Sequence, residues 1–253
     1  MLNHATLAKL QTLRLTGMAR ALEEQFSQPD IDALGFEERL GLLVDRELTH
    51  RDNRILQTRL TRARLRQSAC IEDIDYRSPR GLDRATIARL ASGEWLRAHH
   101  NLLITGPAGV GKSWIGCALS QQACRLGYSV RYLRLPRLLQ DLALARADGS
   151  YNKLLASLAR INLLLIDDWA LAPLNAEARR DLLEIFDDRH QRQSTLITSQ
   201  LPVPQWHDYI GDPTLADAIL DRLVHNAHRI NLNGESLRKR QAPDLTANDS
   251  SNP

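Results

Sequence analysis

Cysteine is scarce in this chain of 253 residues, which has three, Cys70, Cys117 and Cys124. The number is odd and no two form a CxxC pair, so we expect neither a disulfide framework nor a zinc site. No run approaches the roughly 18 apolar residues of a membrane-spanning helix. The N-terminus also lacks an apolar stretch followed by small cleavage-site residues. We therefore expect a cytoplasmic protein with no membrane partner.

Charge of one sign is not in large excess either. The chain has 33 Lys and Arg against 30 Asp and Glu, for a net charge of +3. This total does not by itself require a polyanionic partner. Apolar residues make up 43% of the chain, which suffices for a packed core. The length allows one large domain or two smaller ones.

Residues 1–70 show helical spacing of apolar side chains and no alternating strand pattern. Apolar residues recur between Leu7 and Leu22 and again from Phe36 to Leu60. This spacing predicts a smaller N-terminal all-α domain. We expect a connector at residues 71–100, a second domain at 101–240, and a polar, disordered tail at 241–253.

An arginine-rich stretch lies at residues 51–66, where Asp52 is the single acidic residue. Guanidinium groups match phosphate oxygens, which favours contact with the DNA backbone. A solvated helix whose arginine stems cover apolar surface explains the stretch equally well. The candidate DNA-binding residues are Arg51, Arg54, Arg59, Arg62, Arg64 and Arg66.

Beyond residue 100, short apolar runs alternate with helical segments. Strands are predicted at residues 101–105, 130–133, 161–166, 195–199 and 229–232. Helices are predicted at residues 112–125, 136–147, 152–160, 176–191 and 213–225. The continuous apolar run at 161–166 is typical of a strand buried on both faces of a parallel sheet. The alternation predicts an α/β, doubly wound parallel sheet.

A glycine-rich segment follows the first predicted strand and fits the pattern GxxxxGK[ST]. Glycines let backbone N–H groups turn toward phosphates, and the helix that follows directs its positive end at them. Lys112 is predicted to reach the β- and γ-phosphates, and the Ser113 hydroxyl to ligate Mg²⁺. The predicted nucleotide-binding residues are Gly106, Pro107, Ala108, Gly109, Val110, Gly111, Lys112, Ser113 and Trp114.

An acidic pair, Asp167 and Asp168, follows the apolar run 161–166. Ligands of open parallel sheets bind at the carboxyl ends of the strands. Asp167 is predicted to hold Mg²⁺ through water, and Asp168 to polarise the attacking water. An acid directly after the metal-linked aspartate indicates a hydrolase-type P-loop protein. A solvated loop position is the alternative for Asp168.

Two more catalytic candidates come later in the chain. Gln200 ends the strand expected between the P-loop strand and the acidic strand, where a polar residue contacts the γ-phosphate. Thr198 is the alternative, and a plain turn before Pro202 is a third interpretation. Arg222 lies inside a predicted helix, and its spacing alone favours an exposed surface arginine.

Five segments of the chain follow the pattern of a known protein family: LAKLQTLRLTGMARALEEQ, GFEERLGLLVDRELTHRDNRILQTRLTRARLR, GPAGVGKSWIGCAL, LLLIDDWALAPL and ITSQLPVPQWHDYIGDPTLADAILDRLVHNAHRINLNGESLRKR. On these segments the chain resembles the IstB family of AAA+ ATPases, which lies in the clade of DnaA and DnaC. The resemblance covers nearly the whole chain, to about residue 240. The N-terminal helical segment together with the elements TSQLP, DRLVHNAHRI and GESLR narrows the resemblance to this family.

The resemblance implies an ATP-dependent, DNA-binding helper of insertion-sequence transposition. Such proteins use ATP and Mg²⁺, assemble on double-stranded DNA as ring or helical oligomers, deform it, and stimulate a partner transposase of the IstA type. The resemblance also implies a sensor role for Gln200, an arginine finger at Arg222, and a second basic sensor at Arg238.

Two other functions remain open from the sequence. A helicase loader of the DnaC type shares the ATPase core, but its N-terminal region would hold a replicative helicase and its DNA would be single-stranded. The arginine-rich stretch and the DRLVHNAHRI element favour the transposition helper. A nucleotide-gated scaffold without hydrolysis is the third possibility, because Asp168 stands where many such ATPases carry glutamate.

Overall fold

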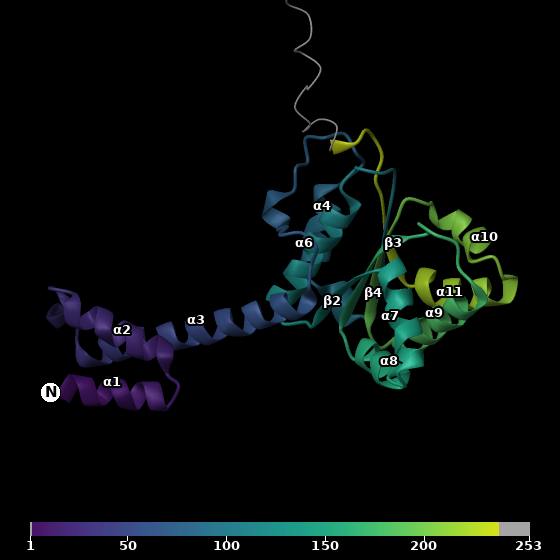
Figure 1. The fold of residues 1–253 in the computed structure, drawn as a ribbon. Helices are drawn as coiled ribbons and strands as arrows, with labels where there is room; N and C mark the ends of the chain where they lie inside the picture. The colour runs from purple at the N-terminus through teal and green to yellow at the C-terminus, as the bar shows by residue number, and fades with distance from the viewer. Residues whose placement is uncertain (1, 238–253) are drawn as a thin grey trace, which may run out of the picture. The chain divides into compact units, whose positions relative to one another are not determined.

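The computed structural model describes residues 2–237 (Figure 1). The chain divides into two compact units between Arg59 and Leu60. The predicted tail at 241–253 lies outside the described residues. No helix that the structure describes is long and apolar enough to cross a membrane.

The N-terminal unit is built of helices, as the apolar spacing predicts. A Cβ atom on Gly17 would lie only 2.8 Å from the carbonyl oxygen of Arg46, so glycine lets α2 approach α3 closely. The elements are α1 (Leu2–Thr12), α2 (Thr16–Ser27), a 3₁₀ turn η1 (Ile31–Ala33) and α3 (Phe36–Ala63), which continues past the division at Arg59.

A buried carboxylate, Glu47 on α3, holds the start of α2. One oxygen accepts the backbone N–H groups of Gly17 at 2.7 Å and Met18 at 3.0 Å, and the other accepts Nε of Arg51 at 2.7 Å. Burial acts to raise the pKa of Glu47, but the hydrogen bonds from Arg51 and the two amides outweigh it and lower the pKa.

Replacement of Glu47 by alanine should destabilise this helical unit. The substitution leaves the Gly17 amide without its acceptor, so the opening free energy of the α2 amides in hydrogen exchange should fall by about 2 kcal/mol. Because the folded-state pKa lies below the unfolded value, the contribution of Glu47 should be complete above the unfolded value and lost as pH falls through the folded one. Exposed Glu23→Ala is the control, and an equal effect of both variants would contradict the assigned role.

The second unit contains a five-stranded sheet in which every pairing is parallel. Its strands are β1 (Asn101–Thr105), β2 (Val130–Arg134), β3 (Leu163–Trp169), β4 (Ser194–Ser199) and β5 (Ala227–Asn231). The order is β2-β3-β4-β1-β5, which confirms that β4 lies between the P-loop strand and the acidic strand. Parallel strands bring the segments after β1, β3 and β4 to one edge of the sheet.

Helices cover both faces of this sheet (Figure 1). On one side lies α6 (Lys112–Arg125), whose Gly116 packs on Leu165 and Leu196. On the other side α7 (Leu135–Ala147), α8 (Tyr151–Ala159), α9 (Ala176–Arg189) and α11 (Pro213–Val224) share an apolar core with the sheet. The remaining elements are η2 (Ile71–Asp73), α4 (Arg84–Ala91), α5 (Glu94–Arg97), η3 (Val203–Gln205) and α10 (Trp206–Ile210).

Candidate nucleotide site

The glycine-rich loop after β1 adopts backbone conformations that side chains disfavour. Gly106, Gly109 and Gly111 have φ angles of 147°, 84° and 96°. A Cβ atom on Gly111 would lie 2.6 Å from Nη1 of Arg80, and Cβ atoms on the other two would collide with Leu232 and Ser236. The loop therefore requires glycine at these positions. Its last turn leads directly into the positive end of α6, which starts at Lys112.

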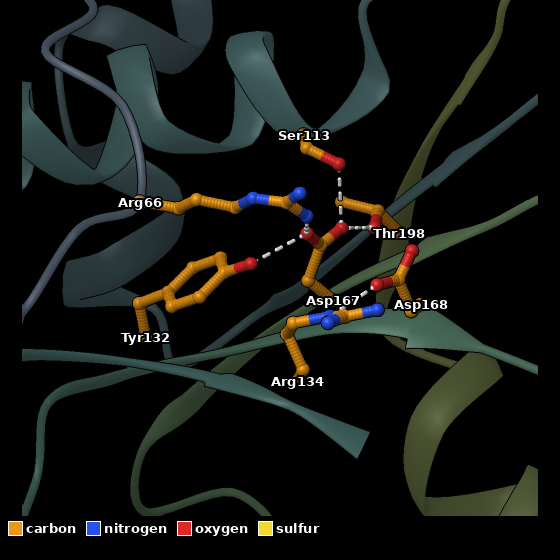
Figure 2. Close-up of polar contacts among 7 residues, drawn as sticks. All are labelled: Arg66, Ser113, Tyr132, Arg134, Asp167, Asp168 and Thr198. Atoms are coloured by element: carbon orange, nitrogen blue, oxygen red, sulfur yellow. Dashed lines mark hydrogen bonds and ion pairs between the residues drawn. The ribbon is translucent and has the colours of Figure 1, made fainter. Parts of the chain in front are cut away.

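The two predicted metal ligands meet at the end of β3. The hydroxyl of Ser113 donates to Oδ1 of Asp167 at 2.7 Å (Figure 2). Thr198 donates to the same oxygen, and the Tyr132 hydroxyl donates to Oδ2 at 2.7 Å. Burial, together with the neighbouring carboxylate, raises the pKa of Tyr132, so its hydroxyl remains a donor. The donor set of carboxylate and hydroxyl oxygens is of the kind that Mg²⁺ prefers.

The second acidic residue, Asp168, differs from Asp167 in environment. Asp167 is completely buried, whereas the Asp168 side chain is 21% exposed and lines the cavity. Asp168 has a φ of 61°, at a break in the pairing of β3 with β4. A positive φ at a non-glycine residue is costly and often marks a functional position. Nε of Arg134 donates to Oδ2 of Asp168 at 2.6 Å, which raises the pKa of Arg134.

Ser113, Thr198, Asp168 and Arg134 line a cavity of about 740 Å³, a size typical of small-molecule sites. Nζ of Lys112 donates to the carbonyl oxygen of Pro107 at 2.7 Å. Of the residues that the sequence predicts at this site, those that line the cavity are Ala108, Gly109, Gly111, Lys112, Ser113, Trp114, Asp168 and Gln200. Gly106, Pro107, Val110 and Asp167 are not among the lining residues. Lining residues that the motifs do not mark include Arg66, Gln67, Asp73, Asp75, Arg80, Arg134 and Leu237.

Arg80 is an example of a site residue without a sequence signal. Its guanidinium is buried beside the glycine-rich loop and donates to the carbonyl oxygens of Val110 at 3.0 Å and Asp75 at 2.9 Å. Burial lowers the pKa of Arg80. Arg80 therefore stabilises the glycine-rich loop through the Val110 carbonyl. It does so from residues 71–100, for which the sequence predicts only a connector.

Arg222 lies away from the cavity of its own chain. The backbone carbonyl oxygen of Arg222 accepts a hydrogen bond from the side chain of Asn101, the first residue of β1. The glycine-rich loop follows the last residue of β1, so Arg222 and the loop lie at opposite ends of this strand. Nε of Arg222 donates to Asp187 at 2.6 Å. The other predicted sensor, Arg238, lies outside the described residues.

The six candidate DNA-binding arginines have different surroundings. Arg51 is paired with Glu47, and Arg66 lines the nucleotide cavity, where its Nη1 lies 3.9 Å from Oδ2 of Asp167. The other four, Arg54, Arg59, Arg62 and Arg64, have exposed or partly exposed side chains. No side-chain ion pair is recorded for these four within residues 2–237.

A parallel sheet with a glycine cradle after β1 and a buried aspartate after the hydrophobic part of β3 defines an α/β P-loop ATPase fold. Residues 8–244 match the family model described as IstB-like ATP binding protein. The chain belongs to this family. A relative named as an insertion sequence ATP-binding protein, y4pL of Sinorhizobium fredii, is 58% identical over 95% of this chain and 98% of its own length.

Solved structures agree on the fold. A crystal structure of DnaI matches with a TM-score of 0.57 and 20% identity, over 65% of this chain and 91% of that chain. A crystal structure of the DnaC helicase loader matches with a TM-score of 0.56 and 18% identity, over 65% of this chain and 96% of that chain. The predicted fold and the predicted membership in the IstB family are therefore confirmed.

Proposed function

We propose that this protein binds Mg-ATP in the cavity at the carboxyl edge of the sheet and hydrolyses it. The observation that carries the proposal is the 2.7 Å contact between Ser113 and Asp167, which joins the two predicted metal-binding side chains from separate elements. The backbone N–H groups of residues 106–111 and the Lys112 ammonium would hold the phosphates, and Ser113 and Asp167 would hold Mg²⁺. Bound Mg²⁺ supplies charge neutralisation at the phosphates.

The remaining polar residues divide into orienting and reacting groups. Thr198 and Tyr132 hold Asp167, so we assign both to positioning that carboxylate. Asp168 faces the cavity and would accept the proton of the attacking water, while Arg134 fixes its orientation. Gln200 also lines the cavity and remains the candidate to orient that water.

The proposed biological role is an ATP-dependent helper of insertion-sequence transposition that assembles on and deforms duplex DNA and stimulates a partner transposase. Support comes from the family, from the relative named for an insertion sequence, and from the arginines along α3. Arginine forms bidentate pairs with phosphate, which suits contact with the DNA backbone. Self-assembly into a ring or helical oligomer would place Arg222 at a neighbour's site.

Replacement of Arg54 by alanine should weaken duplex DNA binding equally across sequences. Loss of one phosphate contact should also reduce the slope of log affinity against log salt by about 1. Fluorescence anisotropy with two unrelated duplexes at several salt concentrations would measure both effects. Arg97→Ala, an exposed arginine on α5, is the matched control. If Arg54→Ala leaves both the affinity for duplex DNA and the salt slope unchanged, Arg54 does not contact DNA.

Phosphate release measured with duplex DNA, single-stranded DNA and no DNA tests the proposed function. The proposal expects ATP turnover that duplex DNA stimulates, and strand transfer by a partner transposase that requires the protein and ATP. No turnover under any condition would support a scaffold that binds nucleotide without hydrolysis. Stimulation by single-stranded DNA together with co-purification of a replicative helicase would favour the helicase loader.

A further inference from the structure

Arg66 is a cation of the nucleotide cavity to which the proposed function gives no role. It lies three residues after Ala63, the last residue of α3, at the end of the arginine-rich stretch. Its side chain lines the cavity together with Lys112 and Ser113. In Figure 2 its guanidinium points toward the carboxylate of Asp167, beside the Tyr132 hydroxyl. A role on DNA alone does not explain this position.

The contact between Arg66 and Asp167 holds the aspartate only weakly. Nη1 of Arg66 lies 3.9 Å from Oδ2 of Asp167, and the Arg66 side chain is 44% exposed, so solvent screens the pair. Hydroxyl donors already occupy both carboxylate oxygens at shorter distances, including those of Ser113 and Tyr132 at 2.7 Å. Arg66 can therefore leave Asp167 without leaving that carboxylate unpaired.

The other cations of the cavity have closer partners among the described residues. Arg134 donates to Asp168 at 2.6 Å, and Arg80 donates to two backbone carbonyl oxygens, of which the nearer lies at 2.9 Å. Lys112 donates to the Pro107 carbonyl at 2.7 Å. Arg66 makes a longer contact to a carboxylate that hydroxyls already satisfy, and it also interacts with the hydroxyl of Tyr132. It is therefore the cation best placed to change partner.

Nucleotide binding gives Arg66 a reason to change partner. With Mg²⁺ at Ser113 and Asp167, Arg66 would share a carboxylate with a dication, which Coulomb repulsion opposes. Phosphate oxygens offer the guanidinium a bidentate partner instead. Asp167 and Asp168 mark the end of the cavity at which the terminal phosphate would react.

We infer that Arg66 binds the terminal phosphate of ATP, turning to it from Asp167. The inference rests on the proposed function and adds a phosphate-binding residue supplied by the segment after α3. Nucleotide state then controls the position of Arg66 and, through the short segment that follows Ala63, of the end of α3. The remaining arginines of the stretch would contact DNA, while Arg66 responds to the third phosphate.

Titration calorimetry with Mg²⁺ and either the non-hydrolysable analogue AMPPCP or ADP tests the inference. In the Arg66→Ala variant the Kd for AMPPCP should rise about ten-fold, while the Kd for ADP should change less than about two-fold. Arg66→Lys should recover part of the AMPPCP affinity, because it keeps the charge and loses the bidentate fork. Arg97→Ala should change neither Kd.

Equal changes for AMPPCP and ADP, or no change for either, would overturn the inference. Unchanged nucleotide affinity with weaker duplex binding would make Arg66 a DNA contact instead. The Lys112→Ala variant distinguishes failure of the proposed function from failure of the role of Arg66. If Lys112→Ala binds AMPPCP as tightly as the native chain, the proposed function is wrong. If Lys112→Ala binds AMPPCP more weakly and Arg66→Ala binds it as tightly as the native chain, only the role of Arg66 is wrong. Arg66→Gln, which keeps much of the side-chain stem, repeats the test if Arg66→Ala shows a lower melting temperature.

Discussion

Replacement of Lys112 by alanine should raise the Kd for Mg-ATP by about a hundredfold or more, since the charged donor to the β- and γ-phosphates is lost. The Lys112 side chain is only 8% exposed and starts α6, so its charge acts together with the positive end of the helix. Loss of this charge should weaken the binding of both ATP and ADP, because the side chain is predicted to reach the β-phosphate that both nucleotides carry. Titration calorimetry would measure the change.

The matched control for this experiment is Lys153→Ala, which removes an exposed lysine of α8 far along the chain from the loop. The control should bind nucleotide as the native chain does. Circular dichroism should show both variants folded, since neither substitution removes an apolar core side chain. Native affinity in folded Lys112→Ala would contradict the assignment of the loop.

Replacement of Arg222 by alanine should lower ATP turnover by about a thousandfold and leave ATP affinity unchanged. Arg222 lies at the edge of the sheet where β1 begins, so it cannot act on the nucleotide of its own chain. The expected effect therefore requires a neighbouring subunit whose site Arg222 completes. If Arg222 only formed an exposed salt bridge with Asp187, the substitution should change the free energy of unfolding by no more than about 1 kcal/mol and leave ATP turnover unchanged.

Mixing experiments distinguish these interpretations. An assembly of Arg222→Ala and Lys112→Ala subunits should regain part of the turnover, because some interfaces combine an intact loop with an intact Arg222. Arg180→Ala, an exposed arginine of α9, should behave as the native protein alone and in mixtures. Full turnover of Arg222→Ala, or no recovery in any mixture, would contradict a site shared between subunits.

The fold was predictable because the spacing of apolar residues along the chain indicates where strands and helices form. Each predicted strand appears in the sheet, and the position of β4 beside β1 follows the predicted order. The ends of β1 and β3 place the loop and Asp167 at one edge, which is why two segments far apart in sequence could be assigned to one site. The structure adds the short helix α10, whose Trp206 and Ile210 are buried by tertiary packing that five residues of sequence do not reveal.

The site residues that the motifs do not mark are brought to the cavity by tertiary contacts. Arg80 and Arg134 reach the cavity by docking against the glycine-rich loop and Asp168, contacts that no spacing rule predicts. Arg66 belongs to a stretch whose composition suggested DNA, yet the chain beyond α3 directs it toward Asp167. The composition of the stretch did not distinguish a DNA contact from a solvated helix, and it gave no sign that Arg66 lines the cavity.

The most direct test of the account is a calorimetric titration of the native protein with ATP, with and without Mg²⁺. The structure predicts saturable binding at one site per chain that Mg²⁺ strengthens, because Ser113 and Asp167 together present oxygens suited to the ion. No saturable binding at millimolar ATP with excess Mg²⁺ would contradict the nucleotide site, and with it the ATP-dependent role on DNA.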